Sequence, residues 1–304
     1  YNLVKKIGKT MIKNGVYAAS VSILNNDKSL DIKSTIYHAE STIKNGLQGV
    51  FFFGSTGQSQ LLSISEKKDL ISKTAISKFK DQFFFGTGVN SLKDNIDLIR
   101  YSMEFGYRTF LIMPPAYYKG NTEKGVYDFY AEIIKEIPKI KIVLYNFEKL
   151  SGYLFSVESV KKLVKNFPKQ IIGCKDSSYN LFQTLKIPDF KIFPGSEAKL
   201  LKGLELGCSG CISAVTNVTH SLARKVFDDF EKNTQQTMNK KIIQVRETFD
   251  EYPLISALHS FLSTEDKKYQ NILPPLTLLD VKSKDEMLNK LKELDFIPLK
   301  NIAA

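Results

Sequence analysis

The chain has few of the features that mark secreted or membrane-spanning proteins. It holds three cysteines among 304 residues, and this odd number does not support a disulfide framework, so a reducing cytoplasm is the simplest setting. No run of about 18 apolar residues is present, and we therefore expect no transmembrane helix. Residues 1–7 also lack the continuous apolar region of a secretory signal.

Metal ligands are also scarce. Cys208 and Cys211 have the C-x-x-C spacing of a zinc-binding pair, but zinc needs a second pair of ligands. Only Cys174 and three scattered histidines remain to supply it. We interpret the C-x-x-C pair as small buried residues around a tight turn, and we predict neither a metal nor another cofactor.

Acidic residues are outnumbered, with 43 Lys and Arg against 32 Asp and Glu, giving a net charge of +11. Such a balance is common in nucleic-acid-binding proteins. The lysines, however, punctuate amphipathic segments along the whole chain and do not gather into a basic tail. We therefore expect a solvated lysine-rich surface with some attraction for anionic substrates, and neither a nucleic-acid nor a membrane partner.

Short apolar segments alternate with longer amphipathic ones through most of the chain. Strands are predicted over residues 16–21, 49–53, 82–86, 109–113, 140–145, 171–175, 191–193 and 210–213. Helices are predicted over residues 32–45, 64–79, 92–105, 122–136 and 157–166. Eight strands alternating with helices predict a (β/α)8 TIM barrel of the α/β class. A doubly wound open sheet is the alternative, but its glycine-rich G-x-G-x-x-G loop is missing after the early strands.

The C-terminal residues have a different pattern, with helices predicted over 221–233, 235–252, 254–263 and 284–294. No linker rich in Pro, Gly or Ser separates them from the preceding residues. We therefore divide the chain into a barrel over residues 1–218 and a helical extension over residues 219–304, packed together as one structural unit.

Chemistry-bearing residues follow several predicted strands, at the end of a barrel where active sites lie. Lys175 ends the sixth strand, and burial disfavours the charged form of a lysine, leaving an amine that can attack a ketone. Ser55 and Thr56 lie in a glycine-framed turn that suits a carboxylate or a phosphate. Tyr145 ends the fifth strand, where it can move protons.

Each of these residues also has a structural interpretation. Lys175 can extend from the sheet to water, and for this residue alone that is the commoner case. The Ser55-Thr56 turn can be an ordinary helix-capping turn, and Tyr145 can be an aromatic at the edge of the core. Their joint occurrence at the ends of three strands favours a catalytic site.

With these motifs the chain resembles the dihydrodipicolinate synthase / N-acetylneuraminate lyase family of pyruvate-dependent class I aldolases. The resemblance runs from about residue 15 to residue 218. Its motifs are Gly54-Ser55-Thr56-Gly57, Leu144-Tyr145-Asn146, Gly173-Cys174-Lys175-Asp176 and Gly207-Cys208-Ser209-Gly210-Cys211-Ile212-Ser213.

The resemblance implies a role for each matched position. Lys175 is expected to form an imine with pyruvate or another 2-keto acid, and Tyr145 to act as the general acid/base. The remaining implied positions are the carboxylate-binding turn Gly54, Ser55 and Thr56, the backbone contact Ile212, the tyrosine Tyr118 that reaches into a neighbouring subunit's proton relay, and Ser177 and Glu197 near the mouth. The resemblance further implies a homotetramer built from two dimers.

Two positions depart from the family pattern. Leu150 stands where dihydrodipicolinate synthases place an arginine that grips the substrate's distal carboxylate, and leucine cannot supply that fork. The Leu150-Ser151-Gly152 run looks more like the aldolases of sialic acid and 2-keto-3-deoxy sugar acids. Ala116 is an apparent insertion before Tyr118 and affects the placement of that tyrosine.

The leading functional hypothesis is therefore a pyruvate-releasing aldolase acting on a 2-keto-3-deoxy sugar acid or a sialic-acid-like substrate. The first alternative is dihydrodipicolinate synthase activity, which condenses pyruvate with aspartate semialdehyde. A related dehydratase or decarboxylating enzyme also stays open. The last alternative is a catalytically silent member that binds a keto acid as a regulator.

Overall fold

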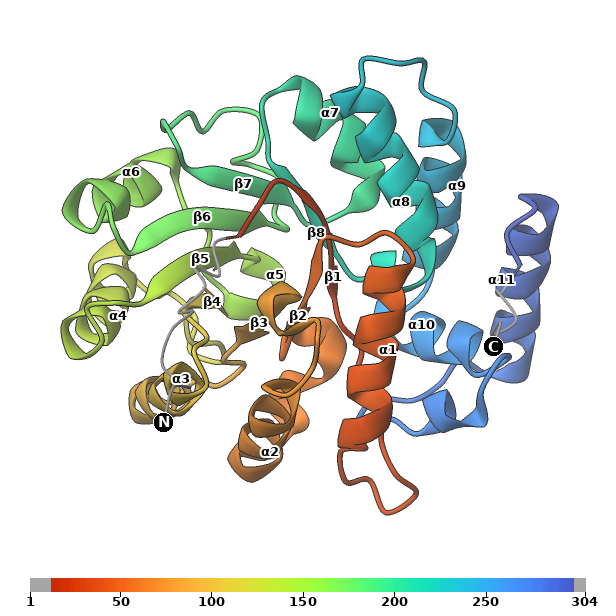
Figure 1. Cartoon of the computed structure of the whole chain (residues 1–304), viewed down its shortest axis with the longest axis horizontal. Helices are drawn as coiled ribbons and strands as arrows, with labels where there is room; N and C mark the ends of the chain where they lie inside the picture. Colours follow the sequence, from red (N-terminus) through yellow and green to blue (C-terminus); the bar gives the residue numbers. More distant parts are fainter. Residues whose placement is uncertain (1–11, 298–304) are drawn as a thin grey trace.

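The computed structural model describes residues 12–297, so residues 1–7, in which no secretory signal is expected, lie outside the described part. A ring of strands forms the centre of the molecule, and helices surround it (Figure 1). Within residues 12–297, none of the helices combines the length and the apolar character that a membrane crossing needs.

The eight strands pair in parallel in the order β7-β6-β5-β4-β3-β2-β1-β8, which confirms the predicted TIM barrel. They span β1 Gly15–Ala19, β2 Gly49–Phe52, β3 Phe83–Gly86, β4 Thr109–Ile112, β5 Lys141–Asn146, β6 Ile171–Asp176, β7 Lys191–Pro194 and β8 Gly210–Ser213.

The barrel is nearly closed between β7 and β8. The N–H of Ser209, just before β8, donates to the carbonyl of Ile192 over 2.8 Å. On its other side β8 approaches β1 so closely that a Cβ on Gly210 would lie 1.8 Å from the carbonyl oxygen of Gly15. With φ at +137°, this position requires glycine.

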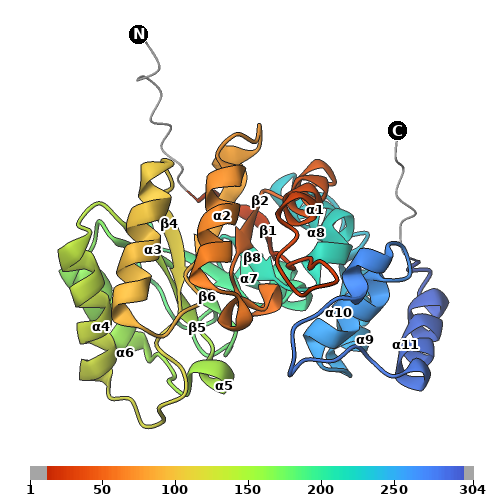
Figure 2. The ribbon, with the colours of Figure 1, turned by 90° about the horizontal axis from the view of Figure 1, so that it is seen from below.

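Helices follow the strands around the outside. They span α1 Ile32–Lys44, α2 Ile64–Thr74, α3 Leu92–Glu104, α4 Glu123–Glu136, α5 Glu148–Ser151, α6 Val157–Asn166, α7 Leu200–Glu205 and α8 Thr216–Glu231. The chain then forms α9 Asn239–Asp250, α10 Leu254–Leu262 and α11 Val281–Glu293, which lie together at one side of the barrel (Figure 2).

The predicted bounds of α2 were too long. Apolar periodicity predicts a helix to residue 79, but α2 ends at Thr74. The hydroxyl of Thr74 lies 2.6 Å from the carbonyl of Ile71 and 2.8 Å from the hydroxyl of Tyr107. Ile76, which continued the periodicity, is 89% exposed. The chain turns here because it must enter β3.

The start of α8 was predicted five residues too late. Threonine and asparagine favour turns in an isolated sequence, but in α8 their side chains bond the barrel. Thr216 Oγ1 donates to the carbonyl of Tyr17 over 3.0 Å, and Asn217 Nδ2 donates to that of Ala19 over 2.7 Å. The boundary expected between residues 218 and 219 therefore falls inside a helix.

The barrel interior contains a cluster of large buried side chains. Tyr17 packs edge-on against Phe51, Phe84 and Phe193 with ring centroids 5.7–5.8 Å apart. Such T-shaped contacts are a favoured aromatic geometry. Because this aromatic cluster fills the interior, we look for a site at the carboxyl ends of the strands.

Candidate active site

Lys175 and Tyr145 are brought together by the pairing of β5 with β6. The two residues are direct partners in the parallel register. Both are buried, with 3% and 4% exposure. Lys175 Nζ donates to the hydroxyl of Tyr145 over 3.3 Å and lies 4.3 Å from the centre of its ring. The amine and the phenol are therefore in direct contact inside the barrel.

The turn after β2 adds a third hydroxyl to this pair. Ser55 Oγ lies 3.1 Å from the hydroxyl of Tyr145. A continuous path of hydrogen bonds thus runs from Lys175 through Tyr145 to Ser55. Thr56, the next residue, is 4% exposed. Three side chains from β6, β5 and the β2 turn converge, although the sequence separates them by up to 120 positions.

The turn itself is held in an unusual conformation. Phe53 and Gln58, which flank it, have φ values of +60° and +55°. Residues with side chains seldom adopt this left-handed region, and where they do, the surrounding structure must enforce it. Such positions cluster at ligand sites. The surrounding structure therefore holds the backbone of this turn in its observed conformation.

A cavity of about 150 Å³ opens beside Tyr145 and Ser55. Its apolar wall includes Leu111, Met113 and Leu150, and Leu150 is 38% exposed. Neutral polar residues contribute as well, among them Ser59, Gln60, Thr87 and Asn90. None of the described residues that line the cavity carries a charge. A distal carboxylate or phosphate would therefore meet no cationic side chain on these walls.

Lys67 is a further buried residue near this cavity, and sequence reasoning did not single it out. Its side chain is fully buried, and Nζ donates to the carbonyls of Thr87 over 3.1 Å and Gly88 over 2.9 Å. Burial lowers the pKa of Lys67 to about 8. Lys67 thus supports the part of the cavity wall formed by Thr87 and Gly88. Its local sequence does not indicate this, because a lysine next to Lys68 in an amphipathic segment resembles a solvated surface residue.

Asp176 fixes the chain immediately after Lys175. It is fully buried, and its carboxylate accepts N–H bonds from Tyr179, Leu181 and Phe182 at 2.8–2.9 Å. Asn146 Nδ2 donates to the same carboxylate over 2.8 Å. These bonds satisfy a buried charge and tie the end of β6 to the end of β5. These hydrogen bonds therefore hold the ends of the two strands that carry Lys175 and Tyr145.

The other predicted site residues differ in their burial and in their local contacts. Ile212 is fully buried inside the barrel on β8. Ser177 follows Asp176 and packs against the backbone of Gly195. The approach is so close that a Cβ added to Gly195 would lie 2.2 Å from the Oγ of Ser177. Tyr118 is 74% exposed. Ala116, two residues before it, does line the cavity, and its N–H donates to Asn90.

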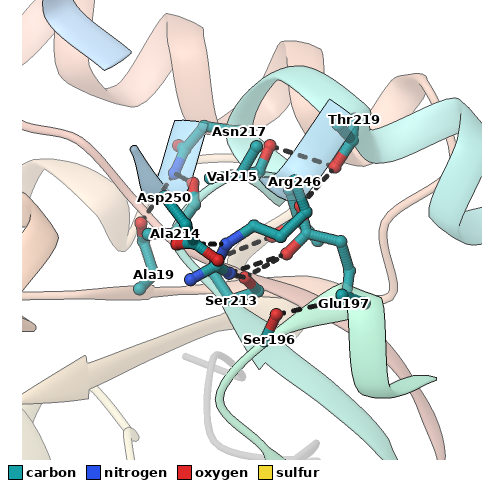
Figure 3. A network of polar contacts seen from close by, with 12 residues as sticks. Ala19, Ser196, Glu197, Ser213, Ala214, Val215, Asn217, Thr219, Arg246 and Asp250 are labelled. Carbon is teal, nitrogen blue, oxygen red and sulfur yellow. Dashed lines mark hydrogen bonds and ion pairs between the residues drawn. The ribbon is translucent and has the colours of Figure 1, made fainter. Parts of the chain in front are cut away.

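Glu197 belongs to a buried polar network on the outer side of β8 (Figure 3). Its two oxygens accept hydrogen bonds from Thr219 over 2.9 Å and from Ser213 and Arg246. Arg246, on α9, lies 3.1 Å from Glu197 and also pairs with Asp250 over 2.9 Å. Protein donors thus engage both oxygens of Glu197, and its role as a substrate contact stays a prediction.

The cysteines are free and buried, as interpreted from the sequence. Burial raises the pKa of the Cys208 thiol to about 11, which keeps it protonated. Among residues 12–297, no group of three or more His, Cys, Asp or Glu side chains is arranged to hold a metal ion.

Comparisons with known proteins identify the family of the chain. The profile of the Dihydrodipicolinate synthetase family matches residues 13–294. A 2-dehydro-3-deoxy-D-gluconate/2-dehydro-3-deoxy-phosphogluconate aldolase of Picrophilus torridus is 26% identical over 253 residues, which cover 79% of this chain and 93% of the relative. A 4-hydroxy-tetrahydrodipicolinate synthase of Methanococcoides burtonii is 27% identical over 297 residues, covering 92% and 98%.

Among solved structures, the dihydrodipicolinate synthase of Agrobacterium tumefaciens superimposes with a TM-score of 0.82. The two chains are 25% identical, and the match covers 93% of this chain and 99% of that one. The likeness extends beyond the barrel, because so large a share of the chain includes the C-terminal helices.

Proposed function

Because the chain belongs to the dihydrodipicolinate synthetase family, we propose that it is a class I aldolase that uses or releases pyruvate. The observation that carries the proposal is the contact path from Lys175 through Tyr145 to Ser55. It supplies a buried amine, a proton carrier and a hydroxyl-bearing turn in one place. These are the parts that imine chemistry on a 2-keto acid needs.

Imine formation is the first step of the proposed reaction. The neutral amine of Lys175 attacks the C2 ketone of a 2-keto acid, and the resulting carbinolamine loses water to give a protonated imine. Tyr145 passes protons between the nitrogen and the departing oxygen. Ser55, Thr56 and the backbone N–H groups of the turn from Gly54 onward hold the substrate carboxylate.

Carbon–carbon cleavage follows from the same imine. A base, the Tyr145 phenolate in this proposal, removes the proton of the C4 hydroxyl, and the C3–C4 bond breaks to release an aldehyde. The electron pair of that bond moves into the protonated imine and gives an enamine. Protonation of the enamine at C3 and hydrolysis of the imine then release pyruvate and restore Lys175. Condensation is the same sequence in reverse.

The proposed substrate is a 2-keto-3-deoxy sugar acid or a sialic-acid-like acid. The uncharged cavity lining and Leu150 support a neutral, hydroxyl-bearing tail, and the aldolase of Picrophilus torridus is named for such substrates. The proposal also includes hydrogen bonds between the substrate's hydroxyl groups and the side chains of Ser177 and Glu197. The name of the Methanococcoides burtonii relative supports the alternative, condensation of pyruvate with aspartate semialdehyde. Retention of Lys175 and Tyr145 argues against a silent keto-acid-binding protein.

We further propose a cytoplasmic homotetramer assembled from two dimers. Tyr118 supports the dimer because its side chain is 74% exposed at the active-site end of the barrel, where a neighbouring chain can receive it. In this arrangement Tyr118 extends the proton path of the neighbouring subunit and not that of its own.

Trapping with borohydride tests the central proposal. Reduction in the presence of pyruvate should leave a stable adduct on Lys175, located by mass spectrometry of the peptide that contains it. Lys175→Ala should show no adduct, whereas Lys169→Ala, an exposed lysine ahead of the same strand, should be labelled like the parent. A parent protein without an adduct would falsify the imine mechanism.

A substrate panel separates the two activities. Cleavage of keto-deoxy sugar acids and sialic acid is measured beside condensation of pyruvate with aspartate semialdehyde. We expect cleavage of a keto-deoxy acid to give the higher kcat/KM. Strong activity in the condensation assay alone would replace the proposed substrate with the alternative.

A further inference from the structure

A buried glutamine connects the C-terminal helices to the turn that carries Ser55 and Thr56. Gln58 follows this turn directly and is 3% exposed. Its Oε1 accepts the backbone N–H of Leu273 over 2.7 Å. Its Nε2 lies 3.5 Å from Nε2 of His259 on α10. Both ends of the amide therefore contact residues more than 200 positions later in the chain.

The protonation of His259 follows from its neighbours. Its Nδ1 lies 2.8 Å from the carbonyl oxygen of Tyr269, which can only accept a hydrogen bond. Nδ1 therefore carries the proton, and Nε2 is left as the acceptor for the Gln58 amide. The direction of the amide is fixed, since its oxygen faces the Leu273 N–H and its nitrogen faces the histidine.

The opposite side of the turn is held by the segment after β1. Ser22 Oγ donates to the carbonyl of Gly57 over 2.7 Å. A Cβ on Gly57 would lie 2.8 Å from the carbonyl oxygen of Ser20, which shows that the backbones of these two residues approach each other closely. The turn is thus fixed from one side by the barrel and from the other by the C-terminal helices through Gln58.

We propose that Gln58 is a positioning residue for keto-acid binding, through which α10 and the segment 269–273 set the geometry of the Ser55–Thr56 turn. Donors that bind a carboxylate must be held within a fraction of an ångström of their productive positions. Gln58 itself faces the C-terminal helices and acts through the turn. This inference rests on the proposed function, because it takes the ligand of the turn to be the keto-acid carboxylate.

Replacement of Gln58 tests the inference on the full-length protein. The pyruvate concentration that gives half-maximal borohydride trapping is compared in the parent, Gln58→Met and Gln58→Glu. Gln58→Met removes both hydrogen bonds and keeps a side chain of similar volume. We expect its half-saturating pyruvate concentration to rise roughly tenfold, which corresponds to about 1.4 kcal/mol of binding free energy. Gln58→Glu keeps an acceptor for Leu273 and should show a smaller rise. Turnover at saturating substrate should change less than half-saturation does.

Met287→Ala provides the matched control. Met287 is fully buried in the core between the C-terminal helices, so its truncation weakens that packing without changing Gln58. Its half-saturation should equal that of the parent. An unchanged value in Gln58→Met, or an equal rise in Met287→Ala, overturns the inference.

If Gln58→Met does not fold, Gln58→Glu decides, and a parental half-saturation there also overturns the inference. A parent protein that traps no pyruvate contradicts the proposed function instead. The two failures are therefore distinguishable.

Discussion

Tyr145 links the amine to the Ser55–Thr56 turn, because its hydroxyl lies 3.3 Å from Lys175 Nζ and 3.1 Å from Ser55 Oγ. Its ring also covers the amine at 4.3 Å. The residue can therefore affect the reaction in two ways, through its hydroxyl and through its ring. Substitution by phenylalanine separates them, because it removes the hydroxyl and keeps the ring.

We expect Tyr145→Phe to retain the pyruvate adduct on Lys175 but to slow turnover by roughly 10²–10⁴-fold, the usual contribution of a general acid/base. Trapping and steady-state kinetics on the same preparation measure both quantities. Tyr153→Phe, which removes a hydroxyl from a tyrosine just after α5, should behave like the parent. Parental turnover in Tyr145→Phe would remove the hydroxyl from the mechanism.

The residues that the sequence analysis singled out are marked by local patterns. The residues that it missed are defined by contacts with distant parts of the chain. Lys175 and Tyr145 were found because each ends a short apolar strand, which is a local pattern. Gln58, Lys67 and Arg246 were missed because their partners lie 20 to 215 positions away. A glutamine in a turn or a lysine in a helix has no unusual local sequence when its function depends on a tertiary contact.

At the scale of elements, the strands were predicted to within two residues at each end, since buried parallel strands are continuous apolar runs. Helix ends were less accurate. The end of α2 depends on the contact of Thr74 with Tyr107, and the start of α8 on the contacts of Thr216 and Asn217 with β1. In both places tertiary hydrogen bonds decide what local propensity leaves open.

The pairing of α9 with the loop after β7 leads to a prediction about stability. The Arg246 and Glu197 side chains are only 7% and 0% exposed, so Arg246→Met leaves a buried carboxylate without its cation. We expect this variant to lose about 3–5 kcal/mol of unfolding free energy. Denaturant unfolding of Arg246→Met, Glu197→Gln and the double variant measures the coupling. The double variant should be more stable than Arg246→Met alone, and strictly additive losses would show that the pair is not coupled.

The three histidines, on α1, α8 and α10, make stability depend on pH. Burial lowers the pKa values of His38, His220 and His259 from 6.5 to about 4. Between these values the unfolded chain binds more protons than the folded protein. Their contribution is therefore fully present above about pH 6.5 and is lost as the pH falls toward 4.

Replacement of one histidine should reduce this dependence. For a single histidine the loss between about pH 7.5 and pH 5 is on the order of 2 kcal/mol. Urea unfolding of His220→Gln at both pH values should show a difference smaller by that amount than in the parent. Lys232→Gln, an exposed substitution just after the same helix, should keep the parental difference. An unchanged difference in His220→Gln would mean that His220 does not contribute.

At the scale of the whole molecule, the helical extension and the barrel are joined by one continuous helix and by hydrogen bonds. The helix α8 crosses the expected boundary at residue 218, Arg246 of α9 bonds Ser213 of β8, and Leu273 bonds Gln58. We therefore propose that the described part of the extension, residues 219–297, forms one folding unit with the barrel. The buried bonds between the two parts support this, because a barrel cut at residue 218 would leave Glu197 without its arginine.

Subunit assembly is the property for which local sequence patterns carry the least information, because it depends on surfaces of two chains at once. If the chain is a tetramer, sedimentation should give four times the 34.5 kDa chain mass. The proposed role of Tyr118 in the neighbouring subunit adds a kinetic test. Tyr118→Phe should retain the adduct on Lys175 and lose turnover, because only the relay from the neighbour is interrupted.

Mixing two inactive variants then decides which subunit Tyr118 serves. When Tyr118→Phe and Lys175→Ala chains are unfolded and refolded together, a mixed dimer contains one site with an intact Lys175 and an intact Tyr118 from the other chain. Random pairing in an isologous dimer restores about a quarter of the parental sites. Activity near that fraction would support exchange across the interface. If Tyr118 serves its own subunit, the mixture stays as inactive as its components, since each chain then lacks one residue of its own site.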